Sequence, residues 1–172
     1  IRRKTDDRQA HRPHRGGQVG QAGLGGQPLQ VALQCAQQPA GARIVLSPAS
    51  RVYLDMKYDA ETPAGGDWAG YISLRHAYDW EPADALPVPV DRIAGVEAAV
   101  WTENIRTARE LYMLLLPRLA AVAELAWSLP ERRDWAGFRA RMRHLGPRWD
   151  ALGLPWYQEA LEEAPIGEPN AP

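Results

Sequence analysis

Apolar and polar residues alternate in blocks that predict strands joined by irregular connections. Residues 43–47 form a short apolar run, and residues 92–101 form a longer one with small side chains. Short apolar runs bounded by turn-forming residues are typical of buried strands. Residues 61–71 and 82–89 are rich in glycine and proline, which favours loops. The pattern therefore predicts two buried strands with a long connection between them.

The connection itself has two shorter predicted elements. Residues 51–55 alternate in character, which predicts extended backbone over the mouth of a site. In an extended segment Tyr53 and Asp55 face the same side, because side chains two apart in a strand share a face. Residues 73–80 predict one or two turns of helix.

Helices are predicted after the second strand. Thr107, with Glu110 three residues later, has the pattern of a capping box and predicts a helix start. This helix continues to residue 127 with a bend or break at Pro117, and residues 134–145 predict a further helix. Four tryptophans are interpreted as packing residues of these closing helices: Trp127, Trp135, Trp149 and Trp156.

Composition divides the chain into three parts. All seven tryptophans, all six tyrosines and the one phenylalanine lie between Tyr53 and Tyr157. Residues 1–41 hold eight of the nine glutamines and no aromatic residue, a composition typical of disorder. We interpret residues 1–41 as a low-complexity, disordered segment, with a shifted reading frame as a hypothesis for its origin. Residues 158–172 predict an acidic, flexible tail.

Bulk properties give no sign of a nucleic-acid, membrane or metal partner. The net charge is −1 and the pI about 6.5, so no general attraction to nucleic acid or membrane is expected. The most apolar run, residues 111–127, is too short and too charged to span a bilayer. Cys35 is the only cysteine, so cysteine usage does not indicate the compartment, and a secreted location, with a cytoplasmic one as the alternative, stays open. Without zinc spacing or a nucleotide-binding motif, we expect neither metal nor cofactor.

Aromatic and acidic residues recur where the predicted strands end. Tyr53 and Asp55 follow the first strand, Trp101 and Glu103 end the second, and Trp68 lies in the loop between them. Aromatic faces stack on the apolar face of a pyranose, and carboxylates accept hydrogen bonds from its hydroxyls. The alternative is structural: a packed tyrosine or tryptophan, an aspartate that caps a turn, and a glutamate that caps a helix. Spacing alone leaves both interpretations open.

Three motifs resemble a known enzyme family. Tyr53-Leu-Asp55, Gly66-Asp-Trp68-Ala-Gly70 and Gly95-Val-Glu-Ala-Ala-Val-Trp101-Thr-Glu103 resemble, in order and spacing, the last third of the β-N-acetylhexosaminidases of glycoside hydrolase family 20. The resemblance covers residues 42–157. One departure is Ala99, where many relatives carry proline or another residue.

The resemblance implies an α/β fold, the C-terminal part of a (β/α)8 TIM barrel with about its last two βα units. With 172 residues the chain is too short for a whole barrel, which typically needs about 250. Active sites of such barrels lie at the C-terminal ends of the strands. Both motif clusters follow predicted strands, which agrees with a site at that end.

The resemblance also implies a role for each residue. Tyr53 would be catalytic, steadying the substrate's 2-acetamido group, whose carbonyl oxygen is the nucleophile. Asp55 and Glu103 would bind ring hydroxyls, Trp101 would wall the acetamido pocket, and Trp68 would cover or stack on the sugar. The implied ligand is a glycan that ends in N-acetylglucosamine or N-acetylgalactosamine.

One expected part of the catalytic apparatus is absent from the sequence. In the family an adjacent Asp-Glu pair, in a His-x-Gly-Gly-Asp-Glu motif, orients the acetamido group and protonates the leaving oxygen. No Asp-Glu dipeptide occurs in the 172 residues. Two interpretations follow: part of a hydrolase that is inert without the remainder of its barrel, or a non-catalytic sugar-binding or interaction module. Two barrel strands would leave open sheet edges, which favours the first.

Overall fold

The computed structural model describes residues 41–162. Residues 1–40 and 163–172 lie outside the described residues, and with them almost all of the predicted low-complexity segment and most of the predicted tail. The described helices and strands are, in chain order, β1 (Ile44–Leu46), α2 (Ala49–Val52), α3 (Leu74–Tyr78), β2 (Ile93–Val96), α4 (Ala108–Leu115), α5 (Arg118–Trp127) and α6 (Trp135–Ala151). Single 3-10 turns lie at Pro82–Asp84, Val90–Arg92, Pro130–Arg132 and Gln158–Leu161.

The two predicted strands are confirmed, and each is shorter than predicted. β1 and β2 pair in parallel, with Ile44 opposite Ile93 and Leu46 opposite Val96. Pairing resumes further along, where Tyr53 bridges Ala99. Because the strands are parallel, the segments that follow them leave the sheet at the same edge. The motifs after β1 and β2 are therefore brought together.

The prediction of extended backbone over residues 51–55 is wrong except at Tyr53, which is extended and bridges Ala99. The N–H groups of Arg51 and Val52 both donate to the carbonyl of Pro48, each at 3.0 Å, and these bonds close the helical turn of α2. A second turn follows at once, because the N–H of Met56 donates to the carbonyl of Tyr53 at 3.2 Å. Tyr53 and Asp55 therefore owe their positions to two tight turns and to the bridge between Tyr53 and Ala99, rather than to a continuous strand.

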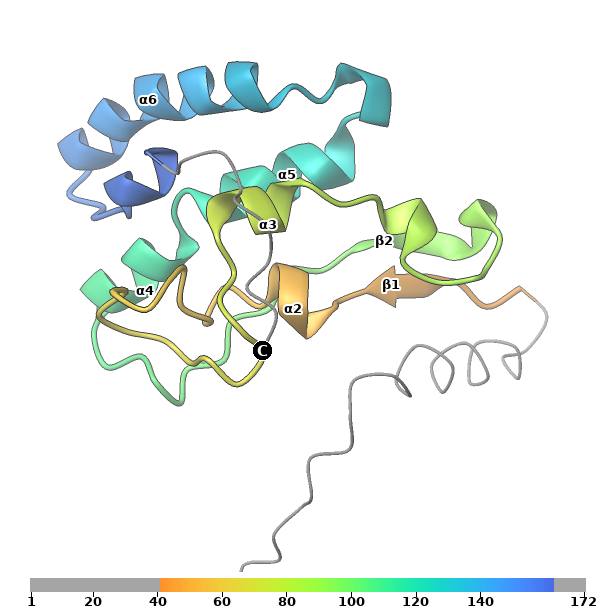
Figure 1. Ribbon diagram of the computed structural model, residues 1–172, viewed down its shortest axis with the longest axis horizontal. Coiled ribbons are helices and arrows are strands. Elements are labelled where there is room, and N and C mark those ends of the chain that lie inside the picture. The colour runs from red at the N-terminus through yellow and green to blue at the C-terminus, as the bar shows by residue number, and fades with distance from the viewer. Residues whose placement is uncertain (1–40, 163–172) are drawn as a thin grey trace, which may run out of the picture.

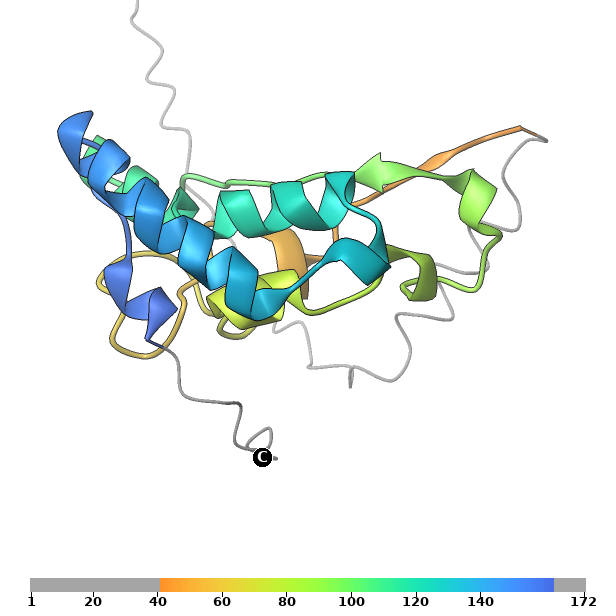
Figure 2. The same ribbon diagram turned by 90° about the horizontal axis from the view of Figure 1, so that it is seen from above.

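The elements are arranged in three tiers (Figure 1). β1 and β2 form the lowest tier, α3 and α5 lie above them, and α6 lies farthest from the strands. The view from above shows α6 crossing over the other helices (Figure 2). The main core cluster includes Leu74, Phe138 and Met142, from α3 and α6. A smaller cluster joins Val52 to Val122 of α5, so the core reaches the segment that carries the site.

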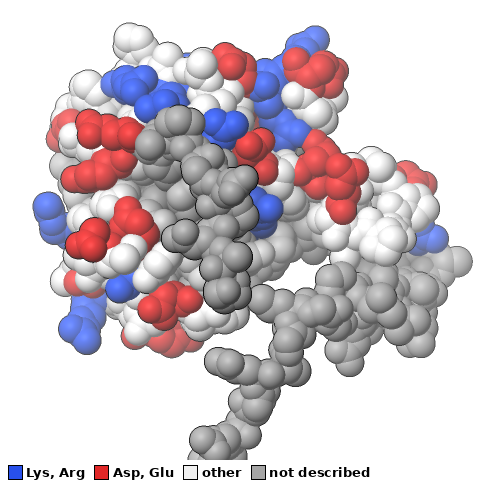
Figure 3. Space-filling view, viewed as in Figure 1, with Lys and Arg blue, Asp and Glu red and all other residues white. Residues whose placement is uncertain are grey.

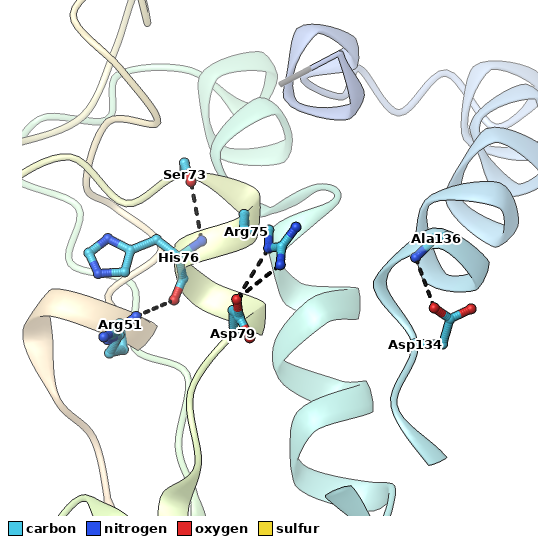
Figure 4. A network of polar contacts seen from close by, with 7 residues as sticks. All are labelled: Arg51, Ser73, Arg75, His76, Asp79, Asp134 and Ala136. Atoms are coloured by element: carbon cyan, nitrogen blue, oxygen red, sulfur yellow. Dashed lines mark hydrogen bonds and ion pairs between the residues drawn. The ribbon is translucent and has the colours of Figure 1, made fainter. Parts of the chain in front are cut away.

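Side-chain caps fix where three of the helices begin. The predicted capping box is confirmed: Thr107 Oγ1 accepts from the Glu110 N–H, and the Glu110 carboxylate accepts from the Thr107 N–H. Asp134 accepts from the N–H groups of Ala136 and Gly137 in α6, and Ser73 accepts from the N–H of His76 in α3 (Figure 4). α6 ends at Ala151, later than predicted. Local sequence therefore gives the helix starts more reliably than their ends.

Contacts between helices also join α2 to α3. Arg51 Nη1 in α2 donates to the carbonyl of His76 in α3 at 3.0 Å (Figure 4). Arg75 of α3 pairs locally with Asp79, the residue that follows the end of this helix. Arg51 is thus engaged in the scaffold.

The predicted packing role holds for three of the four tryptophans. Trp135, Trp149 and Trp156 pack against the main core cluster. Trp127 does not, since it is 90% exposed as the last residue of α5. The predicted tail boundary also needs correction, because Ala160 and Leu161 in the 3-10 turn after Tyr157 are buried in the core.

Acidic and basic side chains are interspersed over the face shown in Figure 3. Neither sign dominates a broad area of the described surface on that face. No helix within residues 41–162 is long and apolar enough to cross a membrane.

Candidate functional site

The five predicted site residues line one open depression of about 470 Å³. It lies beyond the C-terminal ends of β1 and β2, which are at the same end of the sheet because the two strands are parallel. Its lining consists of Tyr53, Asp55, Trp68, Trp101, Glu103 and Asn104. Residues from three separate segments of the chain therefore converge on one space.

Three aromatic rings form one wall of the depression. The Tyr53 ring centroid lies 6.0 Å from that of Trp68, edge to face, and 6.1 Å from that of Trp101. Trp68 is 69% exposed and Trp101 52%, so both indoles can contact a ligand. Large aromatic surfaces left open beside carboxylates favour a ligand with one apolar face and several polar groups.

Asp55 is the buried acid of the site. Its side chain is almost inaccessible, and Oδ1 has no hydrogen-bond partner among the described residues. Burial raises the pKa of Asp55, and the charge of Glu103 adds to this, while hydrogen bonds from the N–H groups of Asp55 and Trp101 act against it. A buried acceptor without a partner is costly unless a ligand donates to it.

A glycine turn holds the Trp68 loop against Asp55. The N–H of Gly66 donates to the carbonyl of Asp55 at 2.9 Å, and the N–H of Lys57 donates to the carbonyl of Gly66 at 2.8 Å. Gly65 has φ +104°, and a Cβ there would lie 2.6 Å from the carbonyl oxygen of Asp55. Only glycine fits this position without displacing the backbone of the site.

Glu103 and Asn104 lie on the segment between β2 and α4, and both are exposed. The capping box at Thr107 fixes the end of this segment by fixing the start of α4. Asn104 was missed by the sequence analysis, although it directly follows the Trp101-Thr-Glu103 motif. It adds an amide, which can both donate and accept, to two carboxylates and a phenol.

Arg118 is a second residue that the sequence analysis missed. It is fully buried, and its guanidinium donates to the carbonyls of Leu54 and Met56, on either side of Asp55. The available signal was a single arginine inside the most apolar run of the chain. That run was interpreted only as a helix with a break.

The chemistry of the depression is that of hydrogen bonding and stacking. Within residues 41–162 no group of three or more His, Cys, Asp or Glu side chains could hold a metal ion. The lining offers aromatic faces, two carboxylates, a phenol and an amide. This combination suits a ligand with hydroxyl and amide groups around an apolar face.

A family comparison agrees with this geometry. The family model described as glycosyl hydrolase family 20, catalytic domain, matches residues 29–130. That range includes every residue lining the depression. It begins inside the segment of residues 1–41 that composition separates from the rest, and the boundary near residue 41 stays a prediction.

Curated relatives and solved structures that resemble this chain are also β-N-acetylhexosaminidases. A beta-N-acetylhexosaminidase of Cellulomonas fimi is 54% identical over 123 residues, which cover 71% of this chain and 25% of that protein. The structure of the GH20 beta-N-acetylhexosaminidase from Streptomyces coelicolor A3(2) matches with a TM-score of 0.72 and 40% identity, over 80% of this chain and 28% of that one. A mutant Streptomyces plicatus beta-hexosaminidase in complex with its product GlcNAc matches with a TM-score of 0.71 and 40% identity, over 80% and 27%.

These matches bear on the fold as well. The matched structures are family 20 barrel enzymes, and the described residues correspond to part of such a barrel. The prediction of a partial (β/α)8 barrel is confirmed. The chain spans about a quarter of the length of these relatives.

Proposed function

The chain belongs to glycosyl hydrolase family 20, and we propose that it is part of a β-N-acetylhexosaminidase. The observation that carries this proposal is the convergence of Tyr53, Asp55, Trp68, Trp101 and Glu103 on one depression. The proposed activity is removal of terminal, non-reducing N-acetylhexosamine from β-linked glycans or chitooligosaccharides. A neighbouring structure that contains the product GlcNAc supports this class of ligand.

Each lining residue has a role in the proposed complex. Trp101 and Tyr53 enclose the acetamido group, and the Tyr53 hydroxyl donates to its carbonyl oxygen. Asp55, which lines the depression, accepts from a ring hydroxyl through its carboxylate. Glu103 binds a further hydroxyl, and the exposed indole of Trp68 stacks on the sugar.

The proposed mechanism is substrate-assisted and retains configuration. The acetamido oxygen attacks the anomeric carbon as the glycosidic bond breaks, giving a cyclic oxazolinium ion, and water then opens that ion. Tyr53 stabilises the acetamido oxygen as it becomes the nucleophile. Protonation of the leaving oxygen requires the Asp-Glu pair, which this sequence does not contain.

The alternative, a free-standing sugar-binding module, is less well supported. β1 and β2 pair only with each other within the described residues, so each has an unpaired edge. Val45 in β1 is 56% exposed, although barrel strands normally bury such side chains. Both features fit a part of a larger sheet.

The test uses a full-length family member that carries tyrosine at the position matching Tyr53. Tyr53→Phe removes the hydroxyl but keeps the ring, so we expect kcat to fall at least about tenfold while KM changes little. This result follows because the interaction strengthens as the amide oxygen becomes a nucleophile. The matching Tyr71→Phe variant, at an exposed tyrosine outside the depression, is the control. An unchanged kcat with a raised KM would assign Tyr53 to ground-state binding only.

A further inference from the structure

Arg118 is the largest fully buried side chain among the described residues, with no exposed surface. It is the first residue of α5. Burying a guanidinium is costly unless its N–H groups find acceptors. The hydrogen-bond acceptors of Arg118 therefore show which parts of the structure its burial holds together.

Backbone carbonyls of three separate segments accept hydrogen bonds from Arg118. Nη2 donates to the carbonyls of Leu54 at 2.8 Å and Met56 at 2.7 Å. Nη1 donates to the carbonyl of Ile72 at 2.8 Å. Nε and Nη2 donate to the carbonyl of Leu114, at 3.2 and 2.9 Å.

Two of the three segments that Arg118 contacts also carry lining residues of the candidate site, Asp55 and Trp68. Leu54 and Met56 flank Asp55 in the tight turn that follows α2. Ile72 lies just beyond the loop that carries Trp68, and its N–H donates to the carbonyl of Lys57 at 2.8 Å. The guanidinium also lies 3.7 Å from the ring centroid of Tyr58. This cation–π contact further restricts the orientation of the guanidinium plane.

We propose that Arg118 is a positioning residue that holds the Asp55 turn and the Trp68 loop in their sugar-binding arrangement. The identity of the bound sugar rests on the proposed function, but the positioning itself does not. Lysine could not replace it, because an ammonium lacks the planar fork that reaches carbonyls in three directions.

The test is amide hydrogen exchange on this chain, comparing the wild type with Arg118→Met and Arg118→Lys. The N–H groups of Gly66 and Lys57 report on the Asp55 turn, because they bond across it. In both variants we expect these two amides to exchange about tenfold faster or more, relative to amides in the middle of α6. The lysine variant keeps the charge and serves if the methionine variant does not fold.

Arg92→Met is the matched control. Arg92 also donates to a backbone carbonyl, that of Ala42 at 2.8 Å, but it lies in the 3-10 turn before β2, away from the site and from α6. It should leave the relative exchange of Gly66 and Lys57 unchanged. If both Arg118 variants raise exchange equally at the turn and in α6, or at neither, Arg118 has only a general structural role and the proposal is wrong.

A second readout follows the electrostatic effect of Arg118 on Asp55. Burial raises the pKa of Asp55, and the charge of Arg118 opposes that rise. The Asp55 carboxyl, followed by carbon-13 NMR, should therefore titrate at higher pH in Arg118→Met.

Sugar binding is measured separately by titration with N-acetylglucosamine. Failure of the sugar to bind the wild type would count against the proposed function without altering the exchange result.

Discussion

Asp55 combines a proposed role in ligand binding with a cost to the stability of the fold. Its carboxylate is buried, and one oxygen has no partner within the described structure. Burial raises the pKa of Asp55, so the folded chain disfavours the ionised form relative to the unfolded chain. Where a folded-state pKa is raised, an acid weakens the fold as pH rises from its ordinary value of 3.8 through the folded-state value.

Asp55→Asn should therefore stabilise this chain at neutral pH, by on the order of 1 kcal/mol, because the amide cannot ionise. The gain should disappear below about pH 3.8, where the aspartate is neutral in both states. Thermal unfolding followed by circular dichroism at pH 7 and pH 3 measures both effects.

Asp91→Asn, at an exposed aspartate, is the control for Asp55→Asn and should shift stability by less than about 0.5 kcal/mol at either pH. A wild type more stable than the Asp55→Asn variant at neutral pH would show that the backbone hydrogen bonds to the ionised carboxylate outweigh the cost of its burial.

At the level of elements, structure that depends on neighbouring residues could be predicted from the sequence, whereas structure that depends on distant residues could not. The start of α4 followed from Thr107 and Glu110, which bond to each other's backbone within one turn. The turn at residues 53–56 did not, because its shape depends on Ala99 and Arg118, which are far away in sequence. An alternating pattern over five residues carries no information about such partners.

The candidate site divides in the same way. Its five expected residues, Tyr53, Asp55, Trp68, Trp101 and Glu103, were predicted from sequence motifs that resemble those of the family. Asn104 lies one residue beyond a motif, and Arg118 contacts backbone rather than ligand, so its role depends on the folded path of three segments. Residues that support a site by bonding to main-chain carbonyls are difficult to identify from a single sequence, because any residue type can supply the carbonyl.

The packing of α6 gives a prediction at this scale. A Cβ at Gly146 would lie 2.3 Å from Cζ2 of Trp156, so the helix and the following segment meet with no room for a methyl group. Alanine has the higher helix propensity, by about 1 kcal/mol. Overpacking should outweigh this gain, and Gly146→Ala should lower the free energy of unfolding by about 1–3 kcal/mol in urea denaturation.

The double variant Gly146→Ala, Trp156→Leu tests the cause. If the clash is responsible, the two changes should couple, and the double variant should be more stable than the sum of the single effects predicts. Additive effects would mean that Gly146 is required for a reason other than Trp156.

On the scale of the whole molecule, the chain presents part of a barrel with part of a site. We expect it not to hydrolyse N-acetyl-β-glucosaminides. A positioned acid typically contributes about 10²–10⁴-fold in rate, and the Asp-Glu pair that supplies it in the family is absent. The measurement is release of a chromogenic aglycone by the purified chain, with a full-length family member as positive control.

The remaining carboxylates offer a sharp check on that expectation. Asp55 and Glu103 are assigned to sugar hydroxyls, not to the glycosidic oxygen. Turnover by the chain that is lost in Glu103→Gln would place the acid within these residues and overturn the assignment.

The bonds from Arg118 to the Asp55 turn also have a consequence during protein synthesis. Arg118 is made 64 positions after Leu54. A ribosome that adds 5–20 residues per second needs roughly 3–13 s to cover that interval. Until then the carbonyls of Leu54 and Met56 cannot bond to this guanidinium, so the Asp55 turn stays incompletely bonded over that interval. A pause in translation between these two points would prolong the exposure of that turn to proteases.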